Sequence, residues 1–321
     1  MMENENNNRR DCPISCQTLG WYHTSFGDQN AADAFSFIQS CGFEAVDYHF
    51  EGLYTASQIR SGSRSPVFDQ PVEKVLEYFA PVKEALEARG IFVSQAHGIS
   101  PKYLSDNKEM NRYLHAVIEK TLEVCRFLKC PYLVLHPIRV LNRSENVELF
   151  QKLIPAALKS DVRICMENMF LKEENGNAPF YDAVTACRMI DELNEMAGRE
   201  IFGICFDVGH ANITGRNLYE DVCAYGNRLM CLHIHDNDGT HDQHLIPCTQ
   251  KKPGVNSPCT DWDGLYDGLS KINYKGPVNF EIHPSLRIVP PELMEDALKF
   301  TASTGRYIRD RILSTSSYTH I

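Results

Sequence analysis

The sequence has no excess of basic residues. Its 321 residues include 32 Lys and Arg against 42 Asp and Glu, which gives a formal net charge of −10 at pH 7. Proteins that bind the phosphate backbone of nucleic acids usually carry a basic stripe or have a high isoelectric point. Nucleic acid is therefore not an expected partner, although a bound metal ion can offset carboxylates locally.

The sequence also lacks the long apolar run of a membrane span and the shorter apolar stretch of a signal peptide. Residues 1–10 are polar and rich in Asn, and we expect them to form a disordered tail. A membrane is therefore not an expected partner either.

Cysteine pairs of the Cys-x-x-Cys type are absent, although the chain has 12 cysteines. Secreted disulfide scaffolds are short and dense in cysteine, and this chain is neither. Cys165, Cys205 and Cys231 lie within apolar runs, where a free cysteine behaves as a small buried hydrophobic residue. This use of cysteine predicts reduced thiols and a cytoplasmic protein.

Short apolar runs alternate along the chain with longer segments of helical periodicity. Each run has the length of a strand and is rich in Val, Ile, Phe, Leu or Cys, as expected for a parallel sheet covered on both faces. The runs that predict strands are Cys12–Leu19, Glu44–Phe50, Ile91–His97, Tyr132–His136, Val162–Asn168, Ile201–Asp207, Leu229–Asp236 and Pro277–His283. The segments that predict helices are Ala31–Ser40, Val72–Ala88, Lys108–Phe127, Glu145–Ser160, Asp182–Ala197, Leu218–Tyr225, Trp262–Lys271 and Pro291–Ile312.

This alternation predicts an α/β fold, a single-domain (β/α)8 TIM barrel over residues 11–321 that ends in a C-terminal helix. A doubly wound open sheet is the competing architecture. Gly90, Gly198 and Gly276 follow helical segments and precede strands, which is the position of a helix C-terminal cap. The Pro-, Gly- and Ser-rich stretch Ile246–Pro258 predicts a long loop after the seventh strand.

Polar residues that can bind metal end seven consecutive predicted strands. A single His at a strand end is usually structural, but in a barrel these ends converge on the face that carries the catalytic loops. Charges gathered there repel one another unless something pairs them, and a bound cation is the simplest compensation. In strand order these residues are His49, His97, His136, Glu167, Asp207, His233 with His235, and Glu281.

The alternation of side chains along a strand indicates where these residues point. Residues two apart share a face, so Glu167 lies on the side of Cys165, and both point inward if the cysteine fills the barrel interior. His233 and His235 also share a face, so one can bind a metal ion while the other binds substrate.

Three carboxylates and one imidazole form an oxygen-rich set for one divalent metal ion. Such a set suits Mn²⁺, Mg²⁺ or Co²⁺ and leaves positions for substrate or water. Structural zinc sites prefer thiolate ligands, and no cysteine spacing in this chain offers them. Zn²⁺ therefore remains an alternative only as a catalytic ion. The predicted ligands are Glu167, Asp207, His233 and Glu281.

Several motifs resemble one known family, the xylose isomerase-like TIM barrels, and within it the sugar phosphate isomerase/epimerase branch. The resemblance extends from about Cys12 into the last helix. The motifs that carry it are Met166-Glu-Asn, Phe206-Asp-Val-Gly-His, Leu232-His-Ile-His-Asp-Asn, Asp242-Gln-His-Leu-Ile-Pro and Phe280-Glu-Ile.

The resemblance implies a metal-dependent isomerase or epimerase that acts on a sugar or sugar phosphate. Its chemistry removes a proton beside a carbonyl and passes through an enediolate. The resemblance makes Glu167 and Glu281 the catalytic acid and base as well as metal ligands. It implies substrate contacts for His97, His136, His210, His235, Asp242 and His244.

The sequence departs from the family and leaves alternatives open. Some epimerases of the family have an Arg six residues after the seventh-strand His, where this chain has Gly239, so a different substrate contact is expected. Dehydratases of keto-inositols share the barrel, and a barrel that binds a sugar without converting it is a third reading. The particular sugar, its phosphorylation and a homo-oligomeric state stay open.

A phosphodiesterase is the main rival. Apurinic-site endonucleases use the same barrel with a cluster of three zinc ions, and their ligand types match a larger set in this chain. That set is His97, His136, Glu167, Asp207, His210, His233, Asp242, His244 and Glu281.

Overall fold

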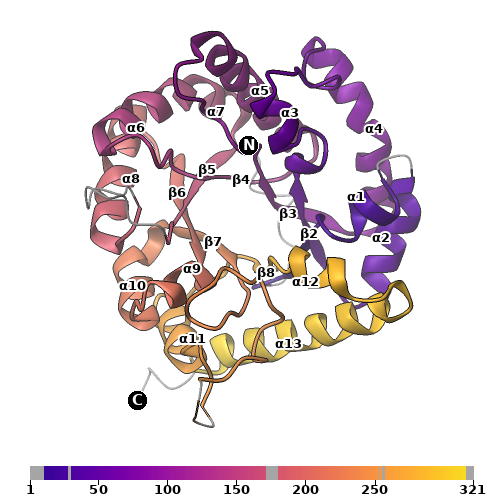
Figure 1. Cartoon of the computed structure of the whole chain (residues 1–321), viewed down its shortest axis with the longest axis vertical. Coiled ribbons are helices and arrows are strands. Elements are labelled where there is room, and N and C mark those ends of the chain that lie inside the picture. Colours follow the sequence, from indigo (N-terminus) through magenta and orange to yellow (C-terminus); the bar gives the residue numbers. More distant parts are fainter. Residues whose placement is uncertain (1–10, 28–29, 171–179, 253, 255–256, 316–321) are drawn as a thin grey trace.

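A computed structural model describes residues 11–27, 30–170, 180–252, 254 and 257–315, so the predicted tail at residues 1–10 lies outside the described residues. Eight short parallel strands stand at the centre of the molecule (Figure 1). The strands are β1 (Ile14–Gln17), β2 (Ala45–His49), β3 (Phe92–His97), β4 (Tyr132–Leu135), β5 (Arg163–Glu167), β6 (Phe202–Asp207), β7 (Leu229–His233) and β8 (Val278–Phe280).

The strand order β7-β6-β5-β4-β3-β2-β1-β8 wraps the sheet into a barrel. The segment just beyond β7 closes it, since the Ile234 amide donates to the Asn279 carbonyl at 2.8 Å and the Glu281 amide donates to the Ile234 carbonyl at 3.2 Å. The predicted single-domain (β/α)8 barrel is confirmed, and the open doubly wound sheet is wrong.

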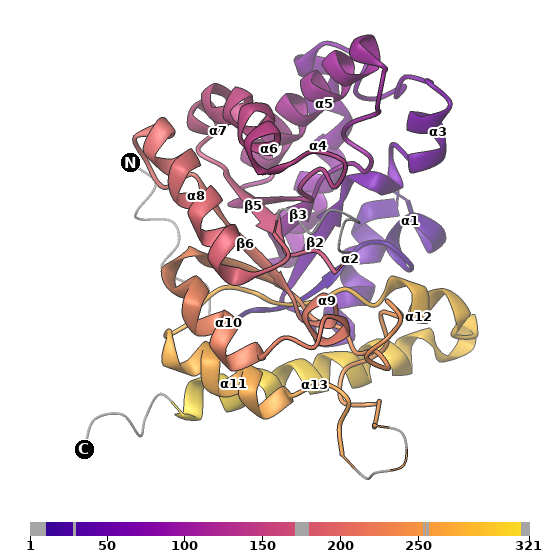
Figure 2. The same ribbon diagram turned by 60° about the vertical axis from the view of Figure 1, so that its left-hand side comes forward.

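A ring of helices covers the outside of the barrel, and the long α13 crosses beneath β8 and β1 (Figures 1 and 2). The ring consists of α2 (Ala31–Ser40), α4 (Val72–Arg89), α5 (Lys108–Phe127), α6 (Arg143–Phe150), α7 (Ile154–Ser160), α8 (Ala183–Ala197), α10 (Leu218–Tyr225), α11 (Trp262–Lys271) and α13 (Met294–Thr315). Shorter helices lie in the loops: α1 (Tyr22–Ser25), α3 (Ala56–Arg60), α9 (Val208–Ile213), α12 (His283–Ile288) and the 3-10 turns η2 (Phe50–Gly52), η3 (Gln151–Leu153), η4 (Gly226–Arg228) and η5 (Pro291–Leu293).

Local sequence fixes where these helices begin and end. Asn107 and Asp182 cap α5 and α8, since their side chains accept hydrogen bonds from the amides of Met110 and Thr185. Gly90 and Gly198 end α4 and α8 in the left-handed conformation, with φ of 66° and 63°, as predicted.

Two local predictions are wrong. The segment Glu145–Ser160 is not one helix, because Pro155 has no amide hydrogen and the chain passes through the turn η3 before α7 starts. Gly276 is not a helix cap, because α11 already ends at Lys271. A Cβ at Gly276 would lie 2.5 Å from the Met230 carbonyl oxygen, so this glycine permits a close approach of two backbone segments.

The barrel interior is separate from the apolar layer between sheet and helices. Val134, Cys165, Cys205 and Cys231 form their own fully buried cluster inside the barrel. The predicted inward face of the strands is therefore confirmed, since Glu167 shares its face with Cys165. The predicted free thiols are also found, and every cysteine of the described residues is unpaired.

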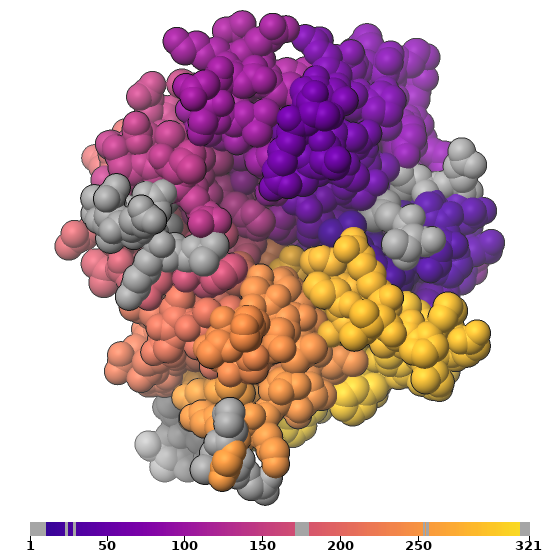
Figure 3. Space-filling view, viewed as in Figure 1, coloured from indigo at the N-terminus to yellow at the C-terminus, as the bar shows by residue number. Residues whose placement is uncertain are grey.

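The face that carries the C-terminal ends of the strands is covered by long loops. In Figure 3 the indigo and purple segments of the first part of the chain meet orange and yellow segments of the last part over its middle. The orange segment after β7 projects beyond the body of the barrel (Figure 2), and residues 253, 255 and 256 of the predicted loop Ile246–Pro258 lie outside the described residues. Within the described part of the chain, no helix is both long and apolar enough to cross a membrane.

Asn146 holds the loop that follows β4. Its side chain accepts from the Ile138 amide at 2.7 Å and donates to the carbonyls of Ile138, Leu141 and Asn142 at 2.9–3.0 Å. Asn146→Ala leaves the buried Ile138 amide without an acceptor and removes three further hydrogen bonds, so we expect the free energy of unfolding to fall by about 3 kcal/mol. Chemical denaturation measures this, with exposed Ser144→Ala as the control. Equal stability of the two variants would contradict this role for Asn146.

Candidate metal centre and substrate site

The four predicted metal ligands all lie at the mouth of the barrel. Glu167, Asp207 and His233 are the last residues of β5, β6 and β7, and Glu281 follows β8 directly. Their exposed fractions are 1%, 0%, 0% and 7%, so three carboxylates and an imidazole are almost wholly removed from water. Such burial of charge is costly unless the groups neutralise one another or bind a cation.

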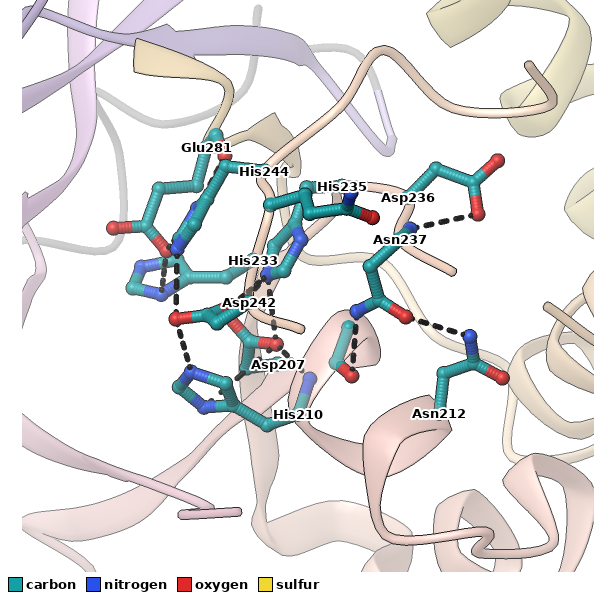
Figure 4. Close-up of polar contacts among 12 residues, drawn as sticks. Asp207, His210, Asn212, His233, His235, Asp236, Asn237, Asp242, His244 and Glu281 are labelled. Carbon is teal, nitrogen blue, oxygen red and sulfur yellow. Dashed lines mark hydrogen bonds and ion pairs between the residues drawn. The ribbon is translucent and has the colours of Figure 1, made fainter. Parts of the chain in front are cut away.

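His233 is the meeting point of two glutamates. Its Nδ1 lies 3.1 Å from Glu167 Oε2. The same atom lies 3.0 Å from Glu281 Oε2, a contact drawn in Figure 4. Neither ring nitrogen of His233 makes a hydrogen bond of acceptable geometry, and neither does Glu167 Oε2. Two buried polar atoms, His233 Nδ1 and Glu167 Oε2, thus lie side by side without satisfying each other.

Asp207 is fixed beside this cluster by its neighbours. It caps α9 by accepting from the His210 amide at 2.6 Å, and its two oxygens lie 3.0 and 3.1 Å from His235 Nε2. Asn168 holds the backbone of Asp207 with two hydrogen bonds, at 2.6 and 2.9 Å. Asp207 pairs in register with His233 on β7, which places the two residues side by side.

A group of histidines flanks Glu167 on the side of β2 to β4. Glu167 Oε2 lies 3.2 Å from His136 Nε2 and 3.7 Å from His97 Nε2. His49 stacks on His97 with ring centroids 4.1 Å apart, and its Nε2 lies 3.8 Å from Glu281 Oε1. The sequence predicts His49 at a strand end without assigning it a role in the site, and the structure places it beside His97 and Glu281.

A second group surrounds Asp242 in the loop after β7. Asp242 Oδ2 lies 3.2 Å from His244 Nε2 and 3.5 Å from His210 Nε2 (Figure 4). His235 stacks on His244 with centroids 4.0 Å apart. Gly209 makes room for the His235 ring, since a Cβ there would lie 1.9 Å from its Cε1 atom. The structure therefore brings all the predicted site residues together.

The buried glutamates and histidines of the mouth shift one another's pKa values. Burial raises the pKa of Glu167, but His136 and His233 lower it by more, and the net pKa is well below the usual range. Burial also raises the pKa of Glu281, but His233 and His49 lower it by more, and the net pKa is again well below the usual range. Burial lowers the pKa of His233, but Cys205, Glu281 and Glu167 raise it by more, to well above its usual value.

The residues present fit a divalent cation. The unsatisfied Glu167 Oε2 and His233 Nδ1 are buried and lie 3.1 Å apart, which is an arrangement that a shared ion would satisfy. The ligand set is typical of Mn²⁺, Mg²⁺ or Co²⁺, since it consists of the carboxylates of Glu167, Asp207 and Glu281 and the imidazole of His233. Further groups with ligand atoms within 4.8 Å of one another include His97, His136 and Glu167, and His235, Asp242 and His244.

Asp47 is a site residue that the sequence analysis missed. It is fully buried beneath the mouth, where its Oδ2 lies 3.6 Å from His233 Nε2. Gln95 and Asn279 donate to the same oxygen at 3.1 and 2.8 Å and hold the carboxylate in place. A carboxylate behind an imidazole fixes which ring nitrogen faces a metal ion. The sequence contains a signal for Asp47, because this residue stands two residues before His49 on the same face of β2.

The fold and the site define an α/β barrel with a buried histidine–carboxylate cluster at the C-terminal mouth of its strands. The family model described as xylose isomerase-like TIM barrel matches residues 35–304. The chain belongs to this family.

Solved structures and a sequence relative extend the comparison. D-allulose 3-epimerase from Methylomonas sp. superposes with a TM-score of 0.67 at 18% identity, over 94% of this chain and 99% of that one. 3-Keto-D-glucoside 4-epimerase from E. coli has a TM-score of 0.63 at 18% identity, over 91% and 99%. A Streptomyces coelicolor protein named Putative hydroxypyruvate isomerase is 27% identical over 233 residues, which are 68% of this chain and 78% of that protein.

The pH dependence of stability tests the group around Asp242. Burial lowers the pKa of His244, but Asp242 and Glu281 raise it by more, to about 9. A histidine whose pKa is higher in the folded state stabilises the protein below its unfolded pKa, about 6.5, and this contribution is lost as the pH rises to about 9. We therefore expect the free energy of unfolding of metal-free protein to fall more between pH 6.5 and 9 than that of His244→Gln.

Denaturation at both pH values in the presence of a chelator measures this difference. His241→Gln is the matched control, since the His241 side chain is 75% exposed and contacts Asp238 and Thr240 of its own turn. The same pH dependence in wild type and His244→Gln would show that His244 is not held protonated by its neighbours.

Proposed function

We propose that this chain is a divalent-metal-dependent isomerase or epimerase of sugars. The observation that carries the proposal is the convergence of two buried glutamates from different strands on His233 Nδ1, at 3.1 and 3.0 Å. The barrel family supports it, and so do the structural similarity to sugar 3- and 4-epimerases and the sequence relative named as a hydroxypyruvate isomerase.

The two glutamates suit proton transfer at a carbon beside a carbonyl. Conversion of a ketose into its epimer or its aldose requires one group to take that proton and one to return a proton. Glu167 and Glu281 fill these roles, one on each side of the reacting carbon. A cation held by Glu167, Asp207, His233 and Glu281 would polarise the carbonyl and stabilise the negative charge of the enediolate.

The remaining polar residues of the mouth are proposed to bind the substrate. They are imidazoles and one carboxylate that can donate or accept hydrogen bonds to hydroxyl groups. Because they surround Glu167 and Asp207, they would lie next to the reacting carbon. These residues are His97, His136, His210, His235, Asp242 and His244.

Glu281→Gln tests the catalytic proposal. Wild type loaded with Mn²⁺ is expected to exchange a ketose proton for deuterium in deuterated water, which NMR detects over a panel of ketoses. The variant loses a proton-transfer group, so the exchange rate should fall about 100- to 10,000-fold. Elemental analysis of the same samples reports whether the metal is retained.

The exposed Glu119 of α5 supplies the control variant, Glu119→Gln. Exchange by Glu281→Gln at the wild-type rate would contradict a catalytic role, and a sugar that binds without exchange would identify a binding protein. Loss of water from the substrate, detected by mass spectrometry, would identify a dehydratase that begins with the same proton abstraction.

A second candidate is a phosphodiesterase with three zinc ions. The observation that favours it is the presence of two further ligand groups beside the first, one with His97 and His136 and one with Asp242 and His244. The net charge of −10 speaks against a nucleic-acid substrate.

Metal content separates the two candidates. We expect about one divalent ion per chain in protein purified without chelator, measured by elemental analysis, because four ligands make one complete site. His210→Asn, in the second group, should leave this content unchanged. About three zinc ions per chain, and loss of one of them in His210→Asn, would favour the phosphodiesterase, and cleavage of abasic DNA would then be the next assay.

A further inference from the structure

His49 is a buried histidine whose ring has no hydrogen-bonding partner in the described part of the chain. It is the last residue of β2 and is only 2% exposed. Neither its Nδ1 nor its Nε2 makes a hydrogen bond among the described residues. A buried polar atom without a partner costs free energy, so its presence in a folded protein points to a bound water molecule or ligand.

The neighbours of His49 place its ring inside the candidate site. His49 pairs in register with His97 on β3, and the two rings stack with centroids 4.1 Å apart. His49 Nε2 lies 3.8 Å from Glu281 Oε1, which is beyond the length of a hydrogen bond. Each of these three residues has a polar atom within 4.8 Å of such atoms in the other two. The His49 ring and the Glu281 carboxylate are therefore close enough for one polar group of a ligand to reach both.

The position of the His49 ring is set before any ligand binds. The His49 amide donates to the Thr18 hydroxyl at 2.9 Å, which anchors the backbone. The His97 ring on which His49 stacks is itself held, since its Nδ1 lies 2.9 Å from the Gly98 carbonyl oxygen. A side chain that is already ordered loses little freedom on binding, so more of the interaction energy contributes to affinity.

A metal ion shared by His49 and His97 does not fit this arrangement. The lone pair of an imidazole nitrogen lies in the plane of the ring, and the two ring planes are only 6° from parallel. Two stacked parallel rings cannot direct their lone pairs at one ion. His49 therefore lies outside the candidate metal centre, although it is a neighbour of Glu281, one of the predicted ligands.

The hydrogen-bonding capacity of the ring indicates the chemistry of the ligand. A neutral imidazole has one nitrogen that donates and one that accepts. A hydroxyl group also donates and accepts, so it can bond to the His49 ring and to the Glu281 carboxylate together. A phosphate would be repelled by Glu281 at this place. Water has the same capacity as a hydroxyl group, so binding of sugars has to separate the two.

We propose that His49 is a specificity-determining residue that forms a hydrogen bond with a hydroxyl group of the sugar beside the carbon on which Glu281 acts. This inference rests on the proposed sugar isomerase function, in which Glu281 transfers a proton. It extends the substrate site to the end of β2 and requires a substrate with a free hydroxyl group next to the reacting carbon.

Binding of sugars that lack single hydroxyl groups tests this contact. The probes are a panel of ketohexoses and the deoxy analogues of the member that binds most tightly, titrated by calorimetry into metal-loaded wild type and His49→Phe. Phe keeps a ring that stacks on His97 but has no hydrogen-bonding atom. We expect the ketohexose to bind about 10- to 100-fold more weakly to His49→Phe, and the analogue without the contacted hydroxyl to bind both proteins equally.

His49→Gln is the conservative variant, because an amide both donates and accepts and should retain part of the affinity. His115→Phe is the matched control, since His115 lies on the outer helix α5 with Glu119 at 3.6 Å. Metal content should match that of wild type in each variant. The melting temperature of metal-free His49→Phe should not fall, because an apolar ring replaces a polar ring without partners.

Equal binding of the whole panel by wild type and His49→Phe would overturn the contact and leave the ring to water. An equal loss for the ketohexose and all its deoxy analogues, or a loss of metal, would also overturn it, since His49 would then act only through the shape of the site. Failure of wild type to bind any ketohexose would overturn it as well.

Proton exchange by wild type is read separately on the same panel. Exchange together with unaffected binding in His49→Phe refutes the contact alone. Absence of exchange together with a loss that depends on one hydroxyl group refutes the isomerase and leaves a sugar-binding site that includes His49.

Discussion

Neutralisation of charge in a buried space is the constraint on which this barrel depends. Glu167, Asp207 and Glu281 are all nearly inaccessible to water. Their backbone positions are set by β5, β6 and β8, together with the two hydrogen bonds of Ile234 that close the barrel. In the absence of a cation, protons on His233 and His210 balance them, since the carboxylates raise the pKa of both histidines. A divalent ion held by these residues, as proposed, would replace those protons and satisfy atoms that otherwise have no partner, and metal binding would then stabilise the mouth.

The layer beneath the mouth gives this cluster its geometry. Asp47 holds the far side of the His233 ring and is itself fixed by Gln95 and Asn279, so Nδ1 is directed to the glutamates. Below it the interior is filled by small thiols such as Cys165 and Cys231, whose sulfur atoms lie 3.5 Å apart. A polar layer over an apolar one keeps water from reaching the ligands from below, which strengthens every electrostatic interaction above it.

The sequence predicts those features that repeat with the period of the fold. Strand length, helix caps and inward-facing positions follow from local patterns, so Glu167, Asp207 and His233 are found where alternation puts them. The break before α7 depends on a single proline within an otherwise helical pattern, and the role of Gly276 depends on Met230, a residue distant in the sequence. The lack of partners around the His49 ring gives no sequence signal, because only the packed structure shows which buried polar atoms are left without a hydrogen bond.

The strand ends and the loops of the site therefore carry different information about function. The histidines and carboxylates at the strand ends serve isomerases and metal-dependent phosphodiesterases equally well, because both need a cation and groups that move protons. The choice of substrate falls to the loops, and here Gly239 stands where the resemblance to some epimerases of the family predicts an arginine. Among the described residues, no arginine forms a hydrogen bond or ion pair with the histidines and carboxylates of the mouth, which suits a neutral polyol better than a phosphodiester and favours the proposed sugar chemistry over the cleavage of a nucleic-acid backbone.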